Sequence, residues 1–349
     1  GTTITTNAII QRRGAKVLFL GTSGIEDLLE LQTSNRPRNY DLLWRRPIPF
    51  VKRINKDHKP YPEGFKFPVK HKINTDDIKV LIWDMDHLPP WQIEMIEKID
   101  AEVLIETTAS NYNDAEPGIS HIIDAMKKGL HVISVNKGPL ALAFPSLMEL
   151  ATYNQVLLRF SGTVGGGTPI LDYAKNSLRG ERIISFQGIL NGTTNYILTN
   201  MAHGLSFNDA LSDAKKKGYV EADESLDLDG LDAAAKLVIL ANWIMGLKVT
   251  MKDIEKIGIR ELTSKDIEDA AKKSCSVKLI ASCNDKLEVS PMQIKNDDPL
   301  CVDGTLNAIS FTSEHSGTQT IIGKGAGGME TASSILRDLL DIRKEISQT

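Results

Sequence analysis

The sequence is poor in several features that would mark other classes of protein. Its three cysteines are an odd number without the spacing of a metal site, which suits a reducing cytoplasm. No apolar run approaches the roughly 20 residues that cross a bilayer, and the first residues lack the charged-then-apolar pattern of a secretory signal. A net charge of −4 provides no basic surface for nucleic acid or for membranes in general. These absences predict a cytoplasmic protein that binds neither nucleic acid nor membranes.

A full dinucleotide-binding loop is also missing from the start of the chain. Residues 17–20 are typical of a buried strand and residues 25–31 of a short helix, which is the context in which a G-x-G-x-x-G loop binds a pyrophosphate. Between them, Gly21 and Gly24 are the available glycines. Asp27 stands where the pattern has its third, close-packing glycine. A plain strand-to-helix turn is therefore the better interpretation.

What is present is an alternation of strand-like and helix-like segments that begins near Ile78. Strands are predicted at residues 80–83, 101–107, 131–135 and 156–160, and helices at 90–99, 118–129 and 145–153. Apolar strands that alternate with helices indicate a parallel sheet covered on both faces. Ligands bind such sheets at the carboxyl ends of the strands. Residues 107–111 and 136–139 fall at those ends.

The spacing changes after about Ser161. Helices are expected to dominate from there to Phe311, with strands near residues 183–189 and 287–291. A glycine-rich segment, 323–328, then leads into a helix predicted over residues 330–342. The chain is long enough for two domains, each with its own core.

Residues 218–236 are the most informative stretch about chemistry. Six carboxylates occupy the twelve positions from Glu221 to Asp232, and residues 233–245 are typical of a buried helix. Asp232 and Lys236 are four residues apart, so they share one face of that helix. Burial lowers the pKa of a lysine and nearby carboxylates raise it, which suits proton transfer. The alternative is a surface ion pair that follows a solvated acidic loop.

Three further segments accompany this stretch, at residues 131–141, 162–170 and 188–197. In this order and spacing the four segments resemble homoserine dehydrogenases, which interconvert L-homoserine and L-aspartate 4-semialdehyde with NAD(P) during threonine, methionine and isoleucine biosynthesis. The resemblance runs from about residue 100 to about residue 340. It implies an α/β fold with a discontinuous Rossmann-like parallel-sheet domain, which can be incomplete at its N-terminus, and an α+β catalytic and dimerisation domain. It also implies a homodimer.

The domain boundaries follow from the resemblance. The first 70 residues form an atypical N-terminal segment, and the dinucleotide-binding domain comprises residues 71–160 and 319–349, because the last helix returns to it. The catalytic and dimerisation domain comprises residues 161–318.

The resemblance assigns roles to the acidic stretch. It implies that Lys236 transfers the hydroxyl proton while the cofactor carries the hydride. The substrate-binding residues that it implies are Glu221, Asp227, Asp232 and Gly218. Carboxylates suit that role because an ammonium group needs several charged acceptors. Asp223 and Glu224 are expected to face solvent, and Glu224 replaces a proline that is usual in the family, which adds backbone freedom to the loop.

The resemblance also implies a cofactor, NAD(P), and a monovalent cation, sodium. The cofactor-contacting residues are Thr107, Lys137 and Gly327, of which Lys137 is also a catalytic residue. The cation is expected on the main-chain oxygens of Ser161, Val164, Gly166 and Thr168. The alternative for these four residues is a tight turn that holds no ion. The residue that distinguishes NAD from NADP has no identifiable counterpart, so neither is preferred.

The N-terminal region has a different resemblance. Residues 1–55 resemble part of the N-terminal region of the hydantoinase and oxoprolinase family, but the phosphate loop of that family is absent. This raises an alternative of another class, namely a catalytically silent fusion chain that retains an amino-acid-binding pocket. The two hypotheses differ on whether residues 1–40 pack as the first strand and helix of the parallel sheet.

Overall fold

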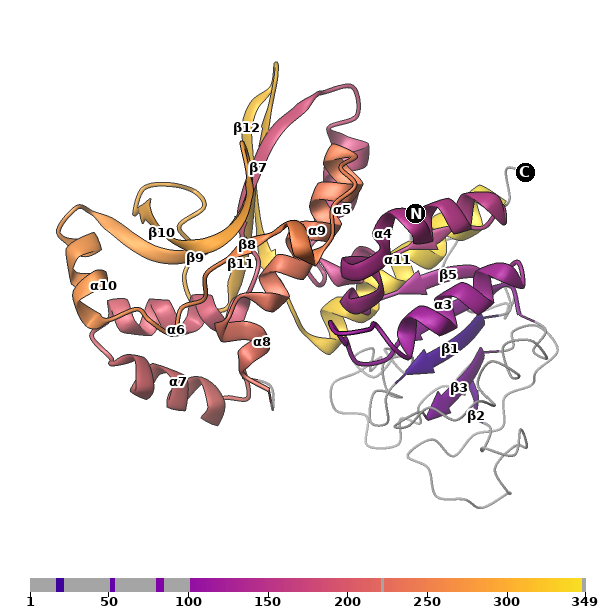
Figure 1. The fold of residues 1–349 in the computed structure, drawn as a ribbon, viewed down its shortest axis with the longest axis horizontal. Coiled ribbons are helices and arrows are strands. Elements are labelled where there is room, and N and C mark those ends of the chain that lie inside the picture. The colour runs from indigo at the N-terminus through magenta and orange to yellow at the C-terminus, as the bar shows by residue number, and fades with distance from the viewer. Residues whose placement is uncertain (1–16, 22–50, 54–79, 85–100, 221–222, 347–349) are drawn as a thin grey trace, which may run out of the picture. The chain divides into compact units, whose positions relative to one another are not determined.

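The computed structural model describes residues 17–21, 51–53, 80–84, 101–220 and 223–346 (Figure 1). The chain divides into two compact units. The first unit contains the chain up to Pro139, then Ser146–Phe160, and the chain from Ile335 onward. The second unit contains Leu140–Pro145 and Ser161–Ser334.

A six-stranded parallel sheet forms the first unit, in the order β2-β3-β1-β4-β5-β6. The strands are β1 (Val17–Gly21), β2 (Val51–Arg53), β3 (Val80–Asp84), β4 (Val103–Thr107), β5 (His131–Ser134) and β6 (Leu158–Arg159). The helices that begin in or return to this unit are α3 (Gly118–Lys127), α4 (Lys137–Tyr153) and α11 (Gly328–Ile346). The predicted parallel sheet is confirmed. The helix expected at residues 90–99 lies outside the described residues.

Successive side chains of β4 point to opposite faces of this sheet and contact a helix on each face. Val103 and Ile105 form one buried cluster with Ile335 and Ile342 of α11. The next side chain in the alternation, Glu106, lies on the opposite face, beside the first residue of α3. Both faces are therefore covered by helices, as the near-continuous apolar strands predict.

β1 lies in the middle of the parallel sheet, paired with β3 on one side and β4 on the other. The strand expected at residues 17–20 is thus confirmed, while the turn and helix expected after it lie outside the described residues. Gly21, the last residue of β1, is in register with Thr107, the last residue of β4. The order of strands along the sheet changes direction between β1 and β4. Ligands of doubly wound sheets bind at such switch points.

α4 begins earlier than the helix expected at residues 145–153. It starts at Lys137 and is capped by Asn136, whose side chain accepts from the main-chain amide of Gly138. Pro145 lies inside the helix, and the backbone at Ala143 is non-helical, with φ of −140° and ψ of 27°. Pro145 was expected to begin the helix, because proline is common at the first helical position. Instead, a kink at Ala143 joins two helical segments into one longer helix.

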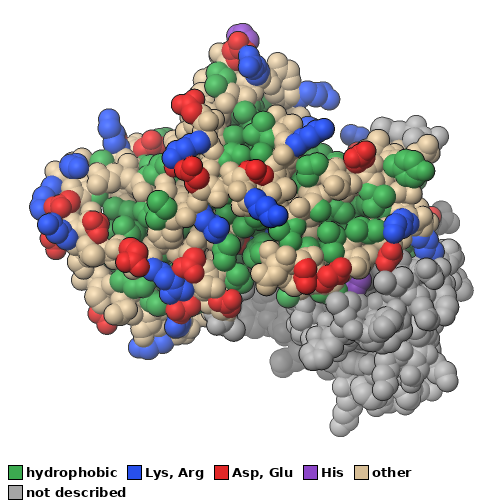
Figure 2. Space-filling model, in the orientation of Figure 1, with side chains coloured by type: hydrophobic (Ala, Val, Ile, Leu, Met, Phe, Trp, Pro, Cys, Tyr) green, Lys and Arg blue, Asp and Glu red, His purple; other side chains and the backbone are tan. Residues whose placement is uncertain are grey.

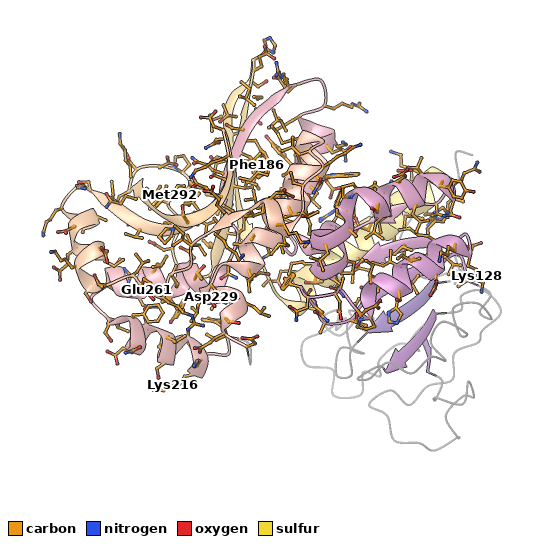
Figure 3. The ribbon with its side chains drawn as sticks, in the orientation of Figure 1. Lys128, Phe186, Lys216, Asp229, Glu261 and Met292 are labelled. Atoms are coloured by element: carbon orange, nitrogen blue, oxygen red, sulfur yellow. The ribbon has the colours of Figure 1, made fainter. Side chains whose placement is uncertain are left out.

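The second unit contains a six-stranded, mainly antiparallel sheet in the order β12-β11-β7-β9-β10-β8. Its strands are β7 (Ile183–Ile189), β8 (Glu255–Lys256), β9 (Cys275–Cys283), β10 (Leu287–Lys295), β11 (Leu306–Ser313) and β12 (Gly317–Lys324). β7, β11 and β12 run side by side in Figure 1. Phe186 on β7, labelled in Figure 3, packs 6.1 Å from Phe311 on β11 between ring centroids.

Two aspects of this unit differ from expectation. Helices contribute more residues than strands between residues 161 and 311, as expected, but β8, β9, β11 and β12 were not predicted from the sequence. A short apolar run such as that of β9 fits a strand or a buried helix equally well. The boundary expected at residue 319 is also too early, since β12 pairs with β11 and the first unit resumes at Ile335.

Helical elements make up much of the rest of the second unit. They are η2 (Ser161–Thr163), α5 (Ile170–Asp172), η3 (Tyr173–Ser177), α6 (Gly192–Ala202), α7 (Phe207–Lys216), α8 (Ser225–Leu228), α9 (Leu231–Met245), η4 (Met251–Asp253) and α10 (Ser264–Ala271). Of these, α6, α9 and α10 contact the strands of the sheet. α9 begins and ends at glycines with positive φ, Gly230 and Gly246, and is buried from Ala233 to Asn242. The buried helix predicted at residues 233–245 is confirmed.

On the face shown in Figure 2, acidic and basic side chains are interspersed, and hydrophobic side chains are exposed between them. Among the described helices, none is both long enough and apolar enough to cross a bilayer.

Candidate active site

Lys236 lies in the second turn of α9, and its side chain is buried to all but 8% of its surface. Its Nζ donates to the main-chain oxygen of Leu190 at 2.6 Å and to Oδ2 of Asp232 at 2.7 Å. The Asp232 side chain is 14% exposed. A buried ammonium is costly unless charged and polar acceptors surround it. The pair is therefore not the surface ion pair that the sequence left open.

Asp227 joins this pair through Asn191. The side-chain nitrogen of Asn191 donates to Oδ1 of Asp227 at 2.6 Å and to Oδ2 of Asp232 at 3.0 Å. Asn191 and Asp227 are 5% and 9% exposed, respectively. Three of the predicted residues, Lys236, Asp232 and Asp227, thus belong to one buried polar network.

Asn191 is a functional candidate that the sequence interpretation missed. It stands between β7 and α6 as the N-cap of α6, and its Oδ1 accepts from the main-chain amide of Thr194 at 2.9 Å. It lies in the 188–197 segment, to which the sequence assigned no individual role. Asparagine is an ordinary N-cap residue, so the start of α6 already explains it. The contact with both carboxylates depends on the packing of α8 and α9.

The loop before α8 contains the remaining predicted substrate residues. Gly218 adopts a positive φ of 73° and closes α7, with its amide donating to the oxygen of Lys215. Its conformation is thereby explained by the end of the helix. Glu221 lies outside the described residues.

Glu224 keeps 30% of its side-chain surface exposed, and its carboxylate takes part in ion pairs at the surface. It forms ion pairs with Lys215 on α7 at 2.5 Å and with Arg260 at 3.4 Å. Arg260 also pairs with Asp229 at 2.6 Å, and Asp229, labelled in Figure 3, caps the C-terminus of α8. Asp223 accepts from the amide and hydroxyl of Ser225. These contacts tie the acidic loop to its neighbours where a proline would have stiffened it.

In the first unit, the ends of β4 and β5 are joined by the side chain of Glu106. This fully buried carboxyl group accepts from the amide of Thr108 at 2.8 Å and from the hydroxyl of Ser134 at 3.2 Å. It also accepts from the hydroxyl of Thr108. Burial raises the pKa of Glu106 to about 7, although hydrogen bonds from Thr108, Ser134 and Asn136 lower it.

Thr107 and Lys137 flank these contacts. Asn136 donates to the hydroxyl of Thr108 at 3.2 Å, and the amide of Lys137 donates to the hydroxyl of Ser110 at 3.0 Å. Thr107 is the last residue of β4, and Lys137 is the first residue of α4, which follows β5. Both predicted cofactor residues therefore lie at the carboxyl edge of the parallel sheet. This edge is where a cofactor is expected.

The predicted cation ligands form a turn in the second unit. Gly165 and Gly166 both have positive φ, at 85° and 55°. The carbonyl of Gly166 accepts from the hydroxyl of Ser334, and that of Thr168 accepts from the amide of Ile170 at 2.8 Å. A carbonyl oxygen has a second lone pair, so these contacts are compatible with an ion. Among the described residues, no group of three His, Cys, Asp or Glu side chains could hold a metal.

Gly327, the third predicted cofactor residue, has a φ of 135°, and a Cβ there would lie 2.1 Å from Oε2 of Glu330. The backbone conformation therefore favours glycine, whereas the flexible Glu330 carboxylate can move aside. This local preference exists with or without a cofactor.

Comparison with known proteins identifies two family models in the chain. A model described as homoserine dehydrogenase matches residues 169–340. A model described as hydantoinase/oxoprolinase N-terminal region matches residues 1–126, which extends well beyond the 55 residues expected.

Individual relatives agree on one family. The chain is 45% identical over 252 residues to the homoserine dehydrogenase of Methanocaldococcus jannaschii, covering 72% of this chain and 75% of the relative. It is 40% identical to the NAD(+)-dependent homoserine dehydrogenase of Pseudomonas canavaninivorans, covering 73% and 74%. The crystal structure of a putative homoserine dehydrogenase from Archaeoglobus fulgidus aligns with a TM-score of 0.74 at 34% identity, covering 94% of this chain and 99% of that one. This chain therefore belongs to the homoserine dehydrogenase family.

Proposed function

We propose that the buried pair of Lys236 and Asp232 is the proton-transfer centre of this homoserine dehydrogenase. The enzyme is an NAD(P)-dependent oxidoreductase that interconverts L-homoserine and L-aspartate 4-semialdehyde, a step of amino-acid biosynthesis. The observation that carries the proposal is the 2.7 Å contact between Lys236 Nζ and Asp232 Oδ2 in a largely buried setting.

The chemistry divides between the cofactor and the chain. When bound, NAD(P) accepts the hydride from the hydroxyl-bearing carbon of homoserine or returns it in the reverse direction. As the neutral amine, Lys236 takes up the hydroxyl proton during oxidation, and the ammonium so formed returns the proton during reduction. Leu190 and Asp232 occupy two positions around the lysine nitrogen, and the remaining position serves the substrate hydroxyl.

The carboxylates of Asp227 and Asp232 are proposed to bind the substrate ammonium group, together with Glu221 and the main chain at Gly218. Charge-assisted hydrogen bonds to an ammonium are about twice as strong as neutral ones. Support comes from the low exposure of Asp227 and Asp232 and from their shared contact with Asn191.

For the cofactor, we propose contacts from Thr107 and Lys137 at the carboxyl edge of the parallel sheet, and from the main chain at Gly327. Lys137 is proposed to act on the substrate as well. The pairing of Gly21 with Thr107 beside the point where strand order reverses supports this location.

A sodium ion is proposed on the main-chain oxygens of Ser161, Val164, Gly166 and Thr168. The left-handed glycines Gly165 and Gly166 support it, because successive turns of this kind direct carbonyl groups to one side. The ion would order this turn against the loop at Gly325, whose backbone lies near Gly166.

We also propose that the enzyme is a cytoplasmic homodimer. β12 is the end strand of its sheet, and end strands invite pairing with another chain. Ile322 on β12 is 48% exposed and Leu306 on β11 is 36% exposed, which provides apolar surface there. The three free cysteines suit a reducing compartment.

The alternative of a catalytically silent fusion chain is not favoured. β1 is in place at the centre of the parallel sheet, and the lysine and carboxylates of the site are assembled. The relatives named above are homoserine dehydrogenases.

The proposal is tested by steady-state oxidation of L-homoserine with NAD⁺ and with NADP⁺, followed by the absorbance of the reduced cofactor. The purified chain is expected to oxidise L-homoserine, and an equal concentration of L-threonine serves as a hydroxyl amino acid of different shape. Absence of turnover with both cofactors, in protein that melts cooperatively, would count against the function.

A further inference from the structure

Asn191 connects the two carboxylates that the proposed function assigns to the substrate. Both hydrogens of its side-chain amide are donated, to Asp227 at 2.6 Å and to Asp232 at 3.0 Å. Because Asp232 also accepts from Lys236, a single amide group lies between one carboxylate and the carboxylate–lysine pair. Asn191 is 5% exposed, so little water competes for these hydrogen bonds.

The orientation of this amide is set from its other end. Its Oδ1 accepts from the Thr194 amide at 2.9 Å and from the Thr194 hydroxyl at 3.0 Å, as the cap of α6. An acceptor is required at that position, so the NH₂ group must point away from the helix. The helix cap therefore directs both donors at Asp227 and Asp232.

The residue before Asn191 contributes to the same arrangement. The main-chain oxygen of Leu190 accepts from Lys236 at 2.6 Å. Leu190 thus contacts Lys236, and the next residue, Asn191, contacts both carboxylates. Because β7 and α6 flank this junction, its position is held by regular structure on both sides.

We propose that Asn191 is a positioning residue for homoserine oxidation, which holds Asp227 and Asp232 in place for the substrate ammonium and for Lys236. This inference rests on the proposed function of that site. Two like charges held close together repel each other, and a shared donor stabilises both as ionised groups. Without the amide, Asp232 loses one of its two described donors and Asp227 loses its contact with this junction.

The role requires an amide and not merely a capping residue. Serine, aspartate and glycine are all accepted at a helix N-cap. Serine has one hydroxyl hydrogen, and an ionised aspartate has no donor and adds a third negative charge. Substitutions at this position can therefore retain the cap while removing the two donated hydrogen bonds.

The test compares Asn191→Ser, Asn191→Asp and Asn191→Ala with the parent enzyme. For Asn191→Ser we expect kcat/KM for L-homoserine to fall by about 10- to 100-fold, as for a lost hydrogen bond to a charged group. The KM for NAD(P) should stay within about twofold and the melting temperature close to the parent's, because the cap remains. Asn191→Ala should lose thermal stability as well.

Asn191→Asp provides a readout that a structural role would not produce. An ionised aspartate at this position adds a third negative charge beside Asp227 and Asp232, and added negative charge raises the pH at which a general base loses its proton. The pH at which kcat for homoserine oxidation reaches half its maximum should therefore move upward relative to both the parent and Asn191→Ser. An unchanged pH profile would contradict the proposal.

Three further outcomes are decisive. A kcat/KM for Asn191→Ser within about threefold of the parent's, below the loss expected for one such hydrogen bond, overturns the role of Asn191. Equal increases in the KM for homoserine and in the KM for the cofactor also overturn it. Activity retained in Lys236→Ala instead overturns the site assignment on which the role rests. If Asn191→Ser does not fold, Asn191→Gly takes its place with the same expectations.

Discussion

A lysine can be buried at residue 236 because its acceptors are supplied by two different parts of the second unit. Asp232 comes from the preceding turn of α9, and the oxygen of Leu190 comes from the end of β7. Losing either would leave an ammonium with too few acceptors away from water, which costs several kcal/mol. The same setting excludes water from the proton that the lysine transfers.

The proton-transfer role predicts a specific kinetic loss. Lys236→Ala should lower kcat by about 10²- to 10⁴-fold with a much smaller change in KM, because general acid–base catalysis acts on the transition state. Steady-state kinetics with L-homoserine measures both constants. Lys248→Ala, which removes an exposed lysine just after α9, is the matched control and should behave like the parent. A fall in kcat of less than tenfold for Lys236→Ala would reject the assignment.

Glu106 predicts a pH dependence of stability. Burial raises its pKa from 4.5 to about 7 in the folded protein, so folding favours the protonated form. Its contribution is fully present below about pH 4.5 and is lost as the pH rises through about 7, a total of about 3 kcal/mol. Glu106→Gln cannot ionise. The difference in free energy of unfolding, parent minus variant, should therefore decline between pH 4.5 and 7, and a constant difference would contradict the prediction.

His121 should act in the opposite direction in the parent. Burial lowers its pKa from 6.5 to about 4, so its contribution is present above about pH 6.5 and is lost as the pH falls towards 4. The two contributions largely cancel between pH 4.5 and 6.5. Chemical denaturation at several pH values, with parent and Glu106→Gln side by side, separates them.

At the scale of elements, the site depends on two junctions. The junction between β7 and α6 presents Leu190 and Asn191, and the junction between α8 and α9 presents Asp227 and Asp232. The second junction is fixed by a close approach of main chains, since the amide of Ile259 donates to the oxygen of Leu228 at 2.8 Å. This contact is possible because residue 258 is glycine.

A side chain at residue 258 should displace the α8–α9 junction. A Cβ there would lie 2.1 Å from the oxygen of Leu228 and 2.7 Å from the Cα of Asp229, and backbone atoms cannot turn aside as a side chain could. Gly258→Ala should lower stability by about 1–3 kcal/mol and reduce kcat/KM for homoserine. Thermal denaturation and kinetics check this. Gly328→Ala, where a Cβ meets nothing within 4 Å, is the control for stability; equal melting temperatures for the two variants would refute the account.

Helices and parallel strands were more predictable than the antiparallel sheet. The apolar run of α9, its flanking glycines and its length all favour one structure, so residues 233–245 could be assigned locally. β12, in contrast, reads Gly-Thr-Gln-Thr-Ile-Ile-Gly-Lys and has no strong pattern of its own. It is a strand because β11 pairs with it, and such pairing depends on context more than on propensity.

At the scale of the whole molecule, the chain combines a parallel-sheet unit with a second unit that contains the proposed catalytic lysine. The N-terminal and C-terminal portions of the chain also match different family models, at residues 1–126 and 169–340. The sequence after β1 departs from the glycine pattern that normally binds the pyrophosphate. That departure has a measurable consequence for the cofactor.

Cofactor binding should be weaker than in an enzyme with a complete glycine loop. A helix N-terminus that cradles a pyrophosphate donates several charge-assisted hydrogen bonds. Losing two, at about 1.5–3 kcal/mol each, would weaken binding by roughly two to four decades. Calorimetric titration with NAD⁺ and with NADP⁺ measures the affinity directly. Micromolar binding of either would show that the residues from Gly21 to Gly24, or another part of the chain, still bind the pyrophosphate.

The amino-acid sequence alone determined the chemistry that this protein performs. Four motifs in order indicated the family, and a helix with Asp232 and Lys236 one turn apart placed the ion pair, because spacing within a helix is local geometry. Sequence resemblance likewise assigned Asp227, but it gave no reason for the contact between Asp227 and Asp232.

Only the tertiary structure decided how these residues meet. Asn191 is an ordinary helix cap in its own segment, and it becomes a link between two carboxylates because α8 and α9 pack against the end of β7. Glu106 is an ordinary carboxylate in sequence, and its pKa is raised because the sheet and α3 exclude water from it. Hydrogen bonds across long sequence separations, and the burial that strengthens them, are properties of the folded chain.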